Sequence, residues 1–306
     1  MDLFPILRPS CRRSAVPGES IFMQSLWMIL ASFLFACMGV CVKLAADAFS
    51  PAELVFYRSA FFLLMTLAMI RVRRQSIVTV HWRFQLWRSL SGFVSLMLYF
   101  YAIALLPLAT AATLSYTSPL FLALYLCGFG KAPWRAGTLL SMAIGFAGVV
   151  LLLNPVWQAN QLWPGLIGLG CGVIAGLAYY NVRELGERGE PEERTVFYFA
   201  LLCTVGSGVW AASTGFHAID RSNGLLLIGI GLFGTVAQLA MTRAYKRGNT
   251  LVSASLAYSA VIFASLFGML FWQEALSPGA CSGIALIVAS GLASTWFSRT
   301  SAAVRE

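Results

Sequence analysis

Ten apolar runs, each close to 20 residues long, follow one another along almost the whole chain and limit what it can fold into. A helix needs about 20 apolar residues to cross the hydrocarbon core of a bilayer. The breaks between the runs are short and carry proline, glycine and charged residues, so they hold no separate soluble domain. We therefore expect an all-α membrane protein with ten transmembrane helices, at residues 24–44, 51–70, 85–105, 108–128, 135–154, 163–182, 195–213, 224–243, 250–272 and 277–297.

The composition agrees with this class. Hydrophobic residues make up 59% of the chain and charged residues only 11%, whereas soluble domains carry about 25% charged residues. A net charge of +9 would suggest a nucleic-acid partner for a soluble protein. In a membrane protein, the same charge must first be tested as a signal of topology.

Lysine and arginine collect on one side of the expected bundle. With the N-terminus placed inside, 18 of the 21 basic residues fall at the inner side, and only Lys43, Arg58 and Arg221 fall outside. Cytoplasmic loops carry such an excess of Lys and Arg. We therefore expect a multi-pass protein of the cytoplasmic (inner) membrane, with both termini in the cytoplasm and no nucleic-acid partner.

The chain contains an internal repeat at an offset of about 142 residues. Four residues of one stretch recur in register in the other: Ala102, Ala112, Leu114 and Tyr116 match Ala244, Ala254, Leu256 and Tyr258. A second match pairs Val55-Phe56-Tyr57 with Val196-Phe197-Tyr198. We divide the chain into a short cytoplasmic tail at 1–22, five-helix repeats at 23–154 and 155–298, and a cytoplasmic tail at 299–306. Met23 directly precedes the first apolar run, so the choice of Met1 or Met23 as the start of translation stays open.

The repeat length sets the relative orientation of the two copies. Five helices per copy is an odd number, so the second copy must enter the membrane from the opposite side. The repeats are then inverted, as in many secondary transporters, which bind substrate near the bilayer midplane at the repeat interface.

Four segments carry a resemblance to a known family: Glu53 to Ser59, Leu114 to Phe121, Trp272 to Ser277 and Gly283 to Gly291. With the paired five-helix units, they make the chain similar to EamA-type members of the drug/metabolite transporter superfamily, from Met23 to about Ser298. The resemblance implies transport of small polar metabolites. Similar members export amino-acid-like compounds or import cofactors such as S-adenosylmethionine or riboflavin. Ala132 stands near the position that corresponds to Glu274, so the role of that acid is not symmetric.

Polar residues at helical spacing predict which helix faces line a central cavity, because polar side chains in a membrane usually face inward. Such stripes include Arg88, Ser91, Ser95 and Tyr99 in the third helix, and Thr235, Gln238, Thr242 and Tyr245 in the eighth. A single Ser or Thr can instead hydrogen-bond to its own helix. The residues that we expect to bind substrate are Arg58, Ser95, Tyr99, Tyr116, Thr117, Gln238 and Tyr258.

The charged residues leave two explanations for Arg58. A guanidinium within a span needs a partner or a water-filled cavity. Arg58 either pairs with Glu53 or Glu274, or binds a carboxylate or phosphate of the substrate. We expect Lys43 to reach the membrane interface. Glu184, Glu187, Glu190, Glu192 and Glu193 are predicted to form a solvated cytoplasmic run.

The sequence disfavours a proton relay at the centre of the membrane. No carboxylate lies at the centre of an expected span, and His81 and His217 fall in loops, where they are poor proton shuttles. Coupling to a gradient would have to use Glu53 or Glu274 near the outer ends of spans, or exchange of substrates.

Pro119 lies near the centre of the fourth expected helix. It removes the hydrogen bond to the carbonyl of Ser115 and predicts a kink, which serves either as a hinge or as a packing solution. The second repeat has Val261 at this position, so we expect only one of the two helices to bend this way. Gly168, Gly172 and Gly176 predict a groove for a close neighbour.

Other classes of protein lack their expected signals. The seven cysteines show no Cys-x-x-Cys spacing, so we expect neither a disulfide framework nor a metal site, and no motif calls for a cofactor. A membrane enzyme would need His, Asp or Cys clustered within the spans, and a channel would need a ring of charges or a carbonyl filter. The sequence predicts a permease for a small zwitterionic or anionic metabolite, with no catalytic residues. A homodimer is a further possibility.

Overall fold

The computed structural model describes residues 23–106, 108–132, 136–155, 162–273 and 278–303. Within these ranges all regular structure is helical. The first half comprises α2 (Trp27–Ala45), α3 (Pro51–Val72), α4 (Trp82–Leu105), α5 (Leu108–Ser115), α6 (Ser118–Gly128) and α7 (Ala136–Leu153). The second half comprises α8 (Leu162–Glu187), α9 (Glu192–Thr214), α10 (Arg221–Arg247), α11 (Thr250–Leu256), α12 (Ser259–Trp272) and α13 (Pro278–Ala303).

Capping residues explain where several helices begin. The Ser50 hydroxyl caps α3 by accepting a hydrogen bond from the backbone N–H of Glu53. The Glu53 carboxylate in turn accepts a hydrogen bond from the backbone N–H of Ser50, and Pro51 occupies the first turn. Asp220 caps α10 and Asn249 caps α11 in a similar way. These short polar residues place the turns of the chain outside the apolar segments.

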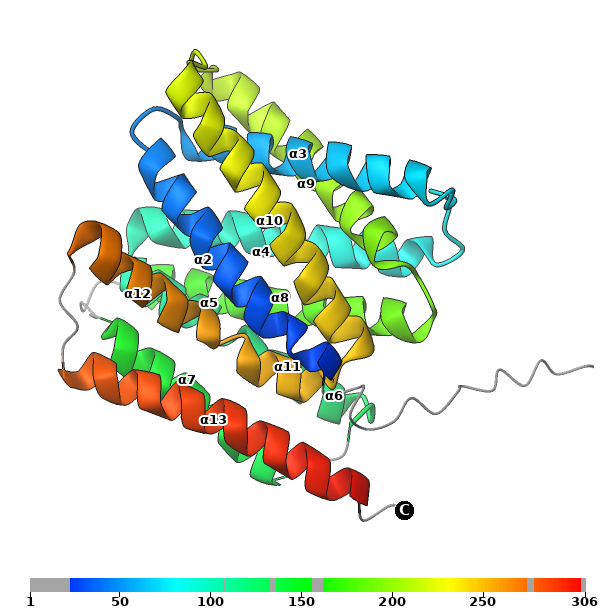
Figure 1. The fold of residues 1–306 in the computed structure, drawn as a ribbon, viewed down its shortest axis with the longest axis vertical. Helices are drawn as coiled ribbons and strands as arrows, with labels where there is room; N and C mark the ends of the chain where they lie inside the picture. The colour runs from blue at the N-terminus through cyan, green and yellow to red at the C-terminus, as the bar shows by residue number, and fades with distance from the viewer. Residues whose placement is uncertain (1–22, 107, 133–135, 156–161, 274–277, 304–306) are drawn as a thin grey trace, which may run out of the picture.

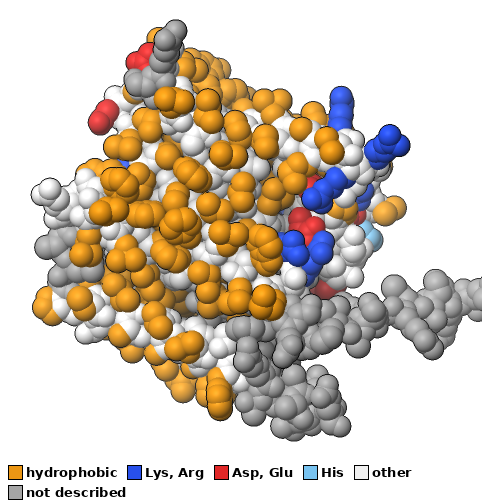
Figure 2. All heavy atoms as spheres, viewed as in Figure 1, with side chains coloured by type: hydrophobic (Ala, Val, Ile, Leu, Met, Phe, Trp, Pro, Cys, Tyr) orange, Lys and Arg blue, Asp and Glu red, His pale blue; other side chains and the backbone are white. Residues whose placement is uncertain are grey.

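The apolar surface confirms a membrane protein. Nine helical segments among the described residues are long and apolar enough to cross a membrane, with α5–α6 and α11–α12 each forming one span. The tenth predicted span is α4, which carries Arg83 and Arg88. Figure 2 shows hydrophobic side chains over a broad face, while Lys and Arg gather at one end. Large apolar side chains are strongly exposed, and Val209 and Leu270 are 71% exposed each. Such a surface suits a lipid environment.

The helix pairs show that the two halves are related as inverted repeats. The most extensive contacts join α2 to α10, α4 to α8, α3 to α9, and α7 to α13, and each pair combines one helix from each half. The first helix of each half packs on the third helix of the other half, and the second and fifth helices pack on their own counterparts. This pattern is what a two-fold relation between halves of opposite direction produces, as predicted from the odd number of helices.

The fourth helix of each half is broken in its middle. In the first half the break lies at Tyr116 and Thr117, between α5 and α6, and Pro119 occupies the first turn of α6. The second half breaks at Ala257 and Tyr258, although it has no proline there. Tyr258 corresponds to Tyr116, so the two breaks overlap in register but are displaced by one residue. Our expectation that only one helix would bend was therefore wrong.

A hydroxyl group performs the same task in both breaks. Thr117 Oγ1 donates to the carbonyl of Leu114 at 2.6 Å, and Ser259 Oγ donates to the carbonyl of Leu256 at 2.7 Å. These pairs correspond in the two repeats. Backbone bonds to the third residue back, such as Tyr258 N–H to the Ser255 carbonyl, tighten the chain on both sides. Both repeats thus share a hydroxyl contact at the break, and only the first repeat has a proline there.

The glycines of α8 confirm the predicted close approach. A Cβ atom on Gly172 would collide with Thr117, one on Gly168 with Leu114, and one on Gly176 would lie 3.0 Å from the carbonyl oxygen of Ser118. Small residues let helix backbones approach in this way. The groove fixes the broken helix α5–α6 against α8.

Candidate functional site

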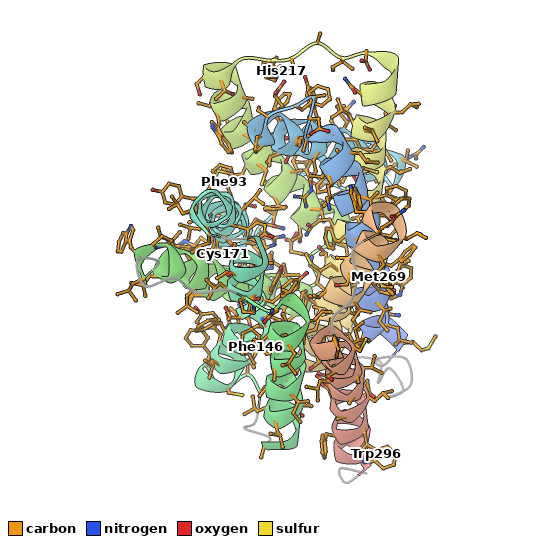
Figure 3. All side chains as sticks on the ribbon, turned by 90° about the vertical axis from the view of Figure 1, so that its left-hand side faces the viewer. Phe93, Phe146, Cys171, His217, Met269 and Trp296 are labelled. Atoms are coloured by element: carbon orange, nitrogen blue, oxygen red, sulfur yellow. The ribbon has the colours of Figure 1, made fainter. Side chains whose placement is uncertain are left out.

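A central cavity of about 350 Å³ lies between the two halves. Side chains from α2, α3, α4, α8, α9 and α10 line it, together with residues at both helix breaks. Figure 3 shows Cys171, one of the lining residues, in the middle of the bundle where α8 faces α4. The break in α5–α6 contributes Tyr116, Ser118 and Pro119, and the break in α11–α12 contributes Ala257 and Ala260. The internal symmetry of the fold is thus centred on this cavity.

Two arginines reach the cavity from neighbouring helices. Arg58 comes from α3 and lies 4.9 Å from the ring centre of Phe62; Arg88 comes from α4 and lies 4.3 Å from that of Phe199. Only 2% of Arg88 is exposed. Among the described residues neither arginine forms an ion pair, and the Nε atom of each lacks a hydrogen-bond partner. An aromatic face compensates only part of the cost of burying a charge.

The structure brings five of the predicted substrate-binding residues together in the lining: Arg58, Ser95, Tyr99, Tyr116 and Gln238. Gln238 is 3% exposed and its Nε2 atom lacks a partner among the described residues. Ser95 donates its hydroxyl to the carbonyl of Cys171 at 3.1 Å, which ties α4 to α8. The role of these residues in binding stays a prediction.

Thr117 and Tyr258 lie outside the described cavity lining. The Thr117 hydroxyl is bonded to Leu114, as described above. Tyr258 is fully buried among Val149, Val261 and Ile287, and its hydroxyl has no partner among the described residues. Both residues lie at the helix breaks and outside the cavity lining. Their position favours a structural role over substrate binding.

The cavity lining also includes Arg88 and several aromatic residues, none of which was among the predicted site residues. Tyr179 and Tyr245 stack with ring centres 5.0 Å apart, and both line the cavity with Phe199 and Phe35. Arg88 and Tyr245 belong to polar stripes that the sequence shows. Tyr179 and Phe199 lie in apolar segments, where an aromatic residue gives no signal that separates a cavity from the core.

The predicted partners of Arg58 are engaged elsewhere or lie outside the described residues. Glu53 is fully buried and accepts hydrogen bonds from the backbone N–H of His217 at 2.6 Å and from Ser50, and its carboxylate lies 2.8 Å from the His217 Nδ1 atom. This contact joins the start of α3 to the loop before α10 (Figure 3). Glu274 lies outside the described residues. Lys43 is exposed, with its Nζ atom 4.0 Å from the ring centre of Trp272.

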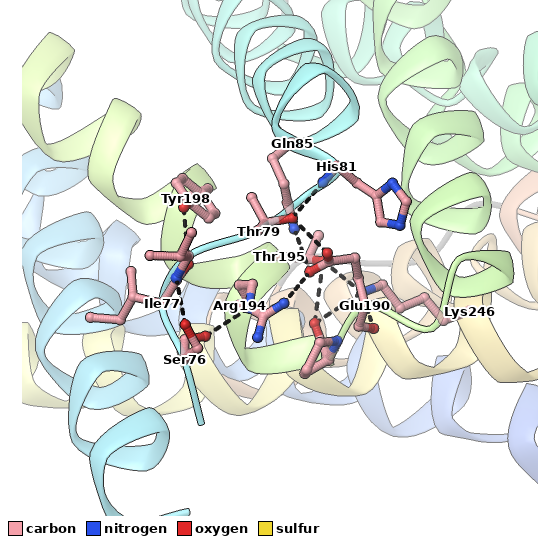
Figure 4. A network of polar contacts seen from close by, with 12 residues as sticks. Ser76, Ile77, Thr79, His81, Gln85, Glu190, Arg194, Thr195, Tyr198 and Lys246 are labelled. Atoms are coloured by element: carbon pink, nitrogen blue, oxygen red, sulfur yellow. Dashed lines mark hydrogen bonds and ion pairs between the residues drawn. The ribbon is translucent and has the colours of Figure 1, made fainter. Parts of the chain in front are cut away.

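The molecule has a charged end, formed by residues 73–85, 184–195 and 243–247, where α3, α8 and α10 end and α4 and α9 begin. Glu190 is its central acid (Figure 4). Its carboxylate accepts hydrogen bonds from Thr79 at 2.5 Å and Gln85 at 3.3 Å, and pairs with Arg194 at 2.9 Å. The Lys246 ammonium donates to the backbone carbonyl of Glu190 at 3.0 Å. These contacts connect the two halves.

Burial and hydrogen bonding act in opposite directions on Glu190. Burial alone would raise the pKa of its carboxyl group, but the bonds from Thr79 and Arg194 outweigh burial and hold the pKa below its ordinary value. The carboxylate is therefore charged at neutral pH.

The prediction of a solvated acidic run was wrong for three of its members. Glu184, Glu190 and Glu193 are 2%, 7% and 4% exposed. Glu184 lies within 3.3 Å of three cations, Arg183, Arg188 and Lys131, and Glu193 pairs with Arg73. The acidic run faces the basic ends of neighbouring helices, and this pairing offsets the cost of burial.

Comparison with known proteins identifies the family. The model of the EamA-like transporter family matches residues 23–154 and 162–296, one match for each half. The chain belongs to the EamA-like transporter family. The EamA chain is 31% identical to a pseudopaline exporter of Pseudomonas aeruginosa, CntI, over 87% of this chain and 93% of the relative.

Two further comparisons extend this relation. A riboflavin transporter of Rhizobium johnstonii is 26% identical over 91% of this EamA chain and 92% of the relative. A protein crystal structure aligns with a TM-score of 0.81 and 21% identity, covering 91% of this chain and 98% of that one, which shows the shared fold. The family and these relatives establish that the chain is a multi-pass membrane transporter.

Proposed function

We propose that this EamA chain is a secondary transporter that moves a small anionic or zwitterionic metabolite, such as an amino acid derivative, across the cytoplasmic membrane by alternating access. The central cavity carries this proposal, because Arg58 and Arg88 both line it and no described lining residue is acidic. The guanidinium fork suits a carboxylate. The inverted halves around one cavity favour alternating access, and the relation to an exporter favours export.

Uptake of a cofactor-like compound is the second candidate. The relation to riboflavin transporters supports it, and so do Tyr179 and Tyr245, whose stacked aromatic rings belong to the cavity lining. S-adenosylmethionine fits less well, because its sulfonium would add positive charge beside two arginines. A channel has no supporting feature in the described residues.

A thermal-shift screen of the purified protein against metabolites tests the site. The wild type is compared with Arg58→Ala and Tyr99→Phe, and with Arg71→Ala as a control at an exposed arginine. Ligands that bind in the cavity should stabilise the wild type and the control but not Arg58→Ala. Equal stabilisation of every variant would place binding elsewhere.

Reconstitution in liposomes tests the mechanism. A ligand from the screen should show saturable flux and counterflow, in which a preloaded ligand drives uptake of a labelled one. Ion-sized conductance would instead support a channel, and chemical conversion of the ligand would support an enzyme.

The charged end is proposed to face the cytoplasm, because it carries most of the described Lys and Arg residues. In a cysteine-free background, a membrane-impermeant maleimide should label Ala46→Cys, in the turn between α2 and α3, from outside intact spheroplasts. Arg74→Cys, at the charged end, should react only after lysis. The reverse pattern would invert the topology. Homodimer formation stays a prediction of the sequence.

A further inference from the structure

Three residues of the cavity lining each carry a buried side-chain nitrogen that lacks a hydrogen-bond partner among the described residues: Arg58 Nε, Arg88 Nε and Gln238 Nε2. All three are donors. A buried donor without an acceptor is costly, so this part of the lining favours a ligand that brings acceptor oxygens. This criterion is stricter than the presence of a single arginine.

The two arginines share one cavity. Arg58 and Arg88 both line the same space of about 350 Å³, together with Tyr179. One ligand that fills this cavity therefore lies near both positive charges.

Arg88 is held in position by its neighbours. Its guanidinium packs over the Phe199 ring, and it fills the space that a side chain at Gly92 would occupy, since a Cβ atom there would collide with Arg88 Nη1 and lie 2.9 Å from Phe199 Cε2. The absence of a side chain at Gly92 thus lets Arg88 lie at the wall of the cavity. A guanidinium held in this way is pre-organised for a ligand.

Charge balance then narrows the substrate class. Two guanidinium groups contribute two positive charges, and the described lining has no carboxylate. A zwitterion would leave both charges uncompensated and a monoanion would leave one, at a cost of several kcal/mol for each buried ion. We propose that the substrate is an organic dianion, with Arg58 and Arg88 each binding one negative charge. This inference rests on the proposed transport function and names its substrate class.

The rest of the lining describes the body of that dianion. Tyr99, Tyr116 and Tyr245 line the cavity beside Phe199 and Tyr179, so an apolar or aromatic group is accommodated next to the acidic groups. Two negative charges in one compound come either from two carboxylates or from one phosphate monoester. Both offer oxygen acceptors to the two guanidinium groups.

A matched set of probes tests the proposal with purified protein in detergent. L-phenylalanine is the zwitterion, 3-phenylpropionate the monoanion, phenylsuccinate the dicarboxylate and phenyl phosphate the phosphate ester. We expect one or both dianions to bind about 10- to 100-fold more tightly than the monoanion, from one additional charge-assisted hydrogen bond. The stronger of the two dianions identifies the source of the second charge.

Two variants test the role of Arg88. Arg88→Gln should reduce the affinity for the dianion to that for the monoanion and leave the affinity for the monoanion within about threefold. Gly92→Ala displaces the same guanidinium without changing the charge of the protein. It should therefore also weaken binding of the dianion more than binding of the monoanion. Arg71→Gln, which removes an exposed arginine, is the control and should change nothing.

The outcomes separate this inference from the transport function. Equal affinity of L-phenylalanine and the dianions, an equal loss for all probes in Arg88→Gln, or no binding of either dianion would overturn the dianion proposal. Counterflow of another metabolite would then still support transport. Absence of counterflow for every metabolite in the screen would overturn the transport function as well.

Discussion

The central cavity and the charged end both bury positive charge, but they neutralise it differently. At the charged end Arg188 lies 2.7 Å from Glu184, and Arg194 lies 2.9 Å from Glu190. In the cavity Arg58 and Arg88 lie against aromatic rings and have no carboxylate partner among the described residues. Two other ion pairs at this end, Arg73 with Glu193 and Lys131 with Glu184, connect the two halves, whereas we propose that the cavity arginines bind a ligand. On this proposal, position in the fold rather than residue type separates the ion-paired arginines from those that bind a ligand.

The largest expected effect is on transport, from removal of one cavity arginine. Arg58→Gln removes a charge that is buried without a carboxylate, so transport should fall by about 100-fold while thermal stability stays unchanged or rises. Flux into proteoliposomes and melting of the same preparation measure the two effects. A drop in melting temperature that matches the loss of transport would contradict a binding role.

Glu184→Gln should destabilise the charged end. It leaves Arg183, Arg188 and Lys131 around an uncharged group, and we expect the free energy of unfolding to fall by about 3–5 kcal/mol. Chemical denaturation in detergent measures this change, and ligand affinity should stay unchanged in the folded fraction. Glu187→Gln is the matched control, since the Glu187 side chain is 32% exposed and, among the described residues, forms an ion pair with Arg183 alone.

Acid should weaken the charged end through Glu190. Its folded pKa lies below the ordinary 4.5, so its contribution to stability is complete at neutral pH and is lost as the pH falls below 4.5 and through the lowered folded pKa. Glu190→Gln should cost about 1–3 kcal/mol at pH 7 and make the acid side of the stability profile flatter. Thermal melting between pH 7 and pH 3 measures the effect, and an unchanged profile would contradict it.

The smallest effect is expected from an exposed pair at the same end. Arg247 lies 2.5 Å from Glu192, but 56% of its side chain is exposed. Solvent screens such pairs, so Arg247→Gln should cost no more than about 1 kcal/mol. A cost as large as that of Glu184→Gln would show that burial does not set the value of these pairs.

The sequence predicts the fold well because the membrane imposes a simple rule. Runs of about 20 apolar residues, an odd number per repeat and the residue matches at an offset of 142 were sufficient to predict ten spans and inverted halves. Arg58 was also accessible to prediction, because a charge inside an apolar span must be explained by a partner or a cavity.

The remaining features depend on contacts that the sequence does not show. Glu184 looks solvated because its neighbours in sequence are charged, but its partner Lys131 comes from a different helix end. The break beside Tyr258 has no proline to signal it in the sequence, and Ser259, which follows it, is a residue that is common in unbroken helices as well. Tyr179 and Phe199 need the packing of α8 and α9 to distinguish a cavity wall from the core.

The cross-pairing of α2 with α10, α4 with α8, α3 with α9 and α7 with α13 has a consequence for assembly. Each half on its own would leave most of its helix-packing surfaces uncovered, because the four most extensive helix contacts all join one half to the other. The main contacts between the halves are non-covalent and do not require that α7 and α8 belong to one polypeptide. Two separately translated polypeptides, divided between these helices and co-expressed in one membrane, would contain every major contact needed to reassemble the complete carrier.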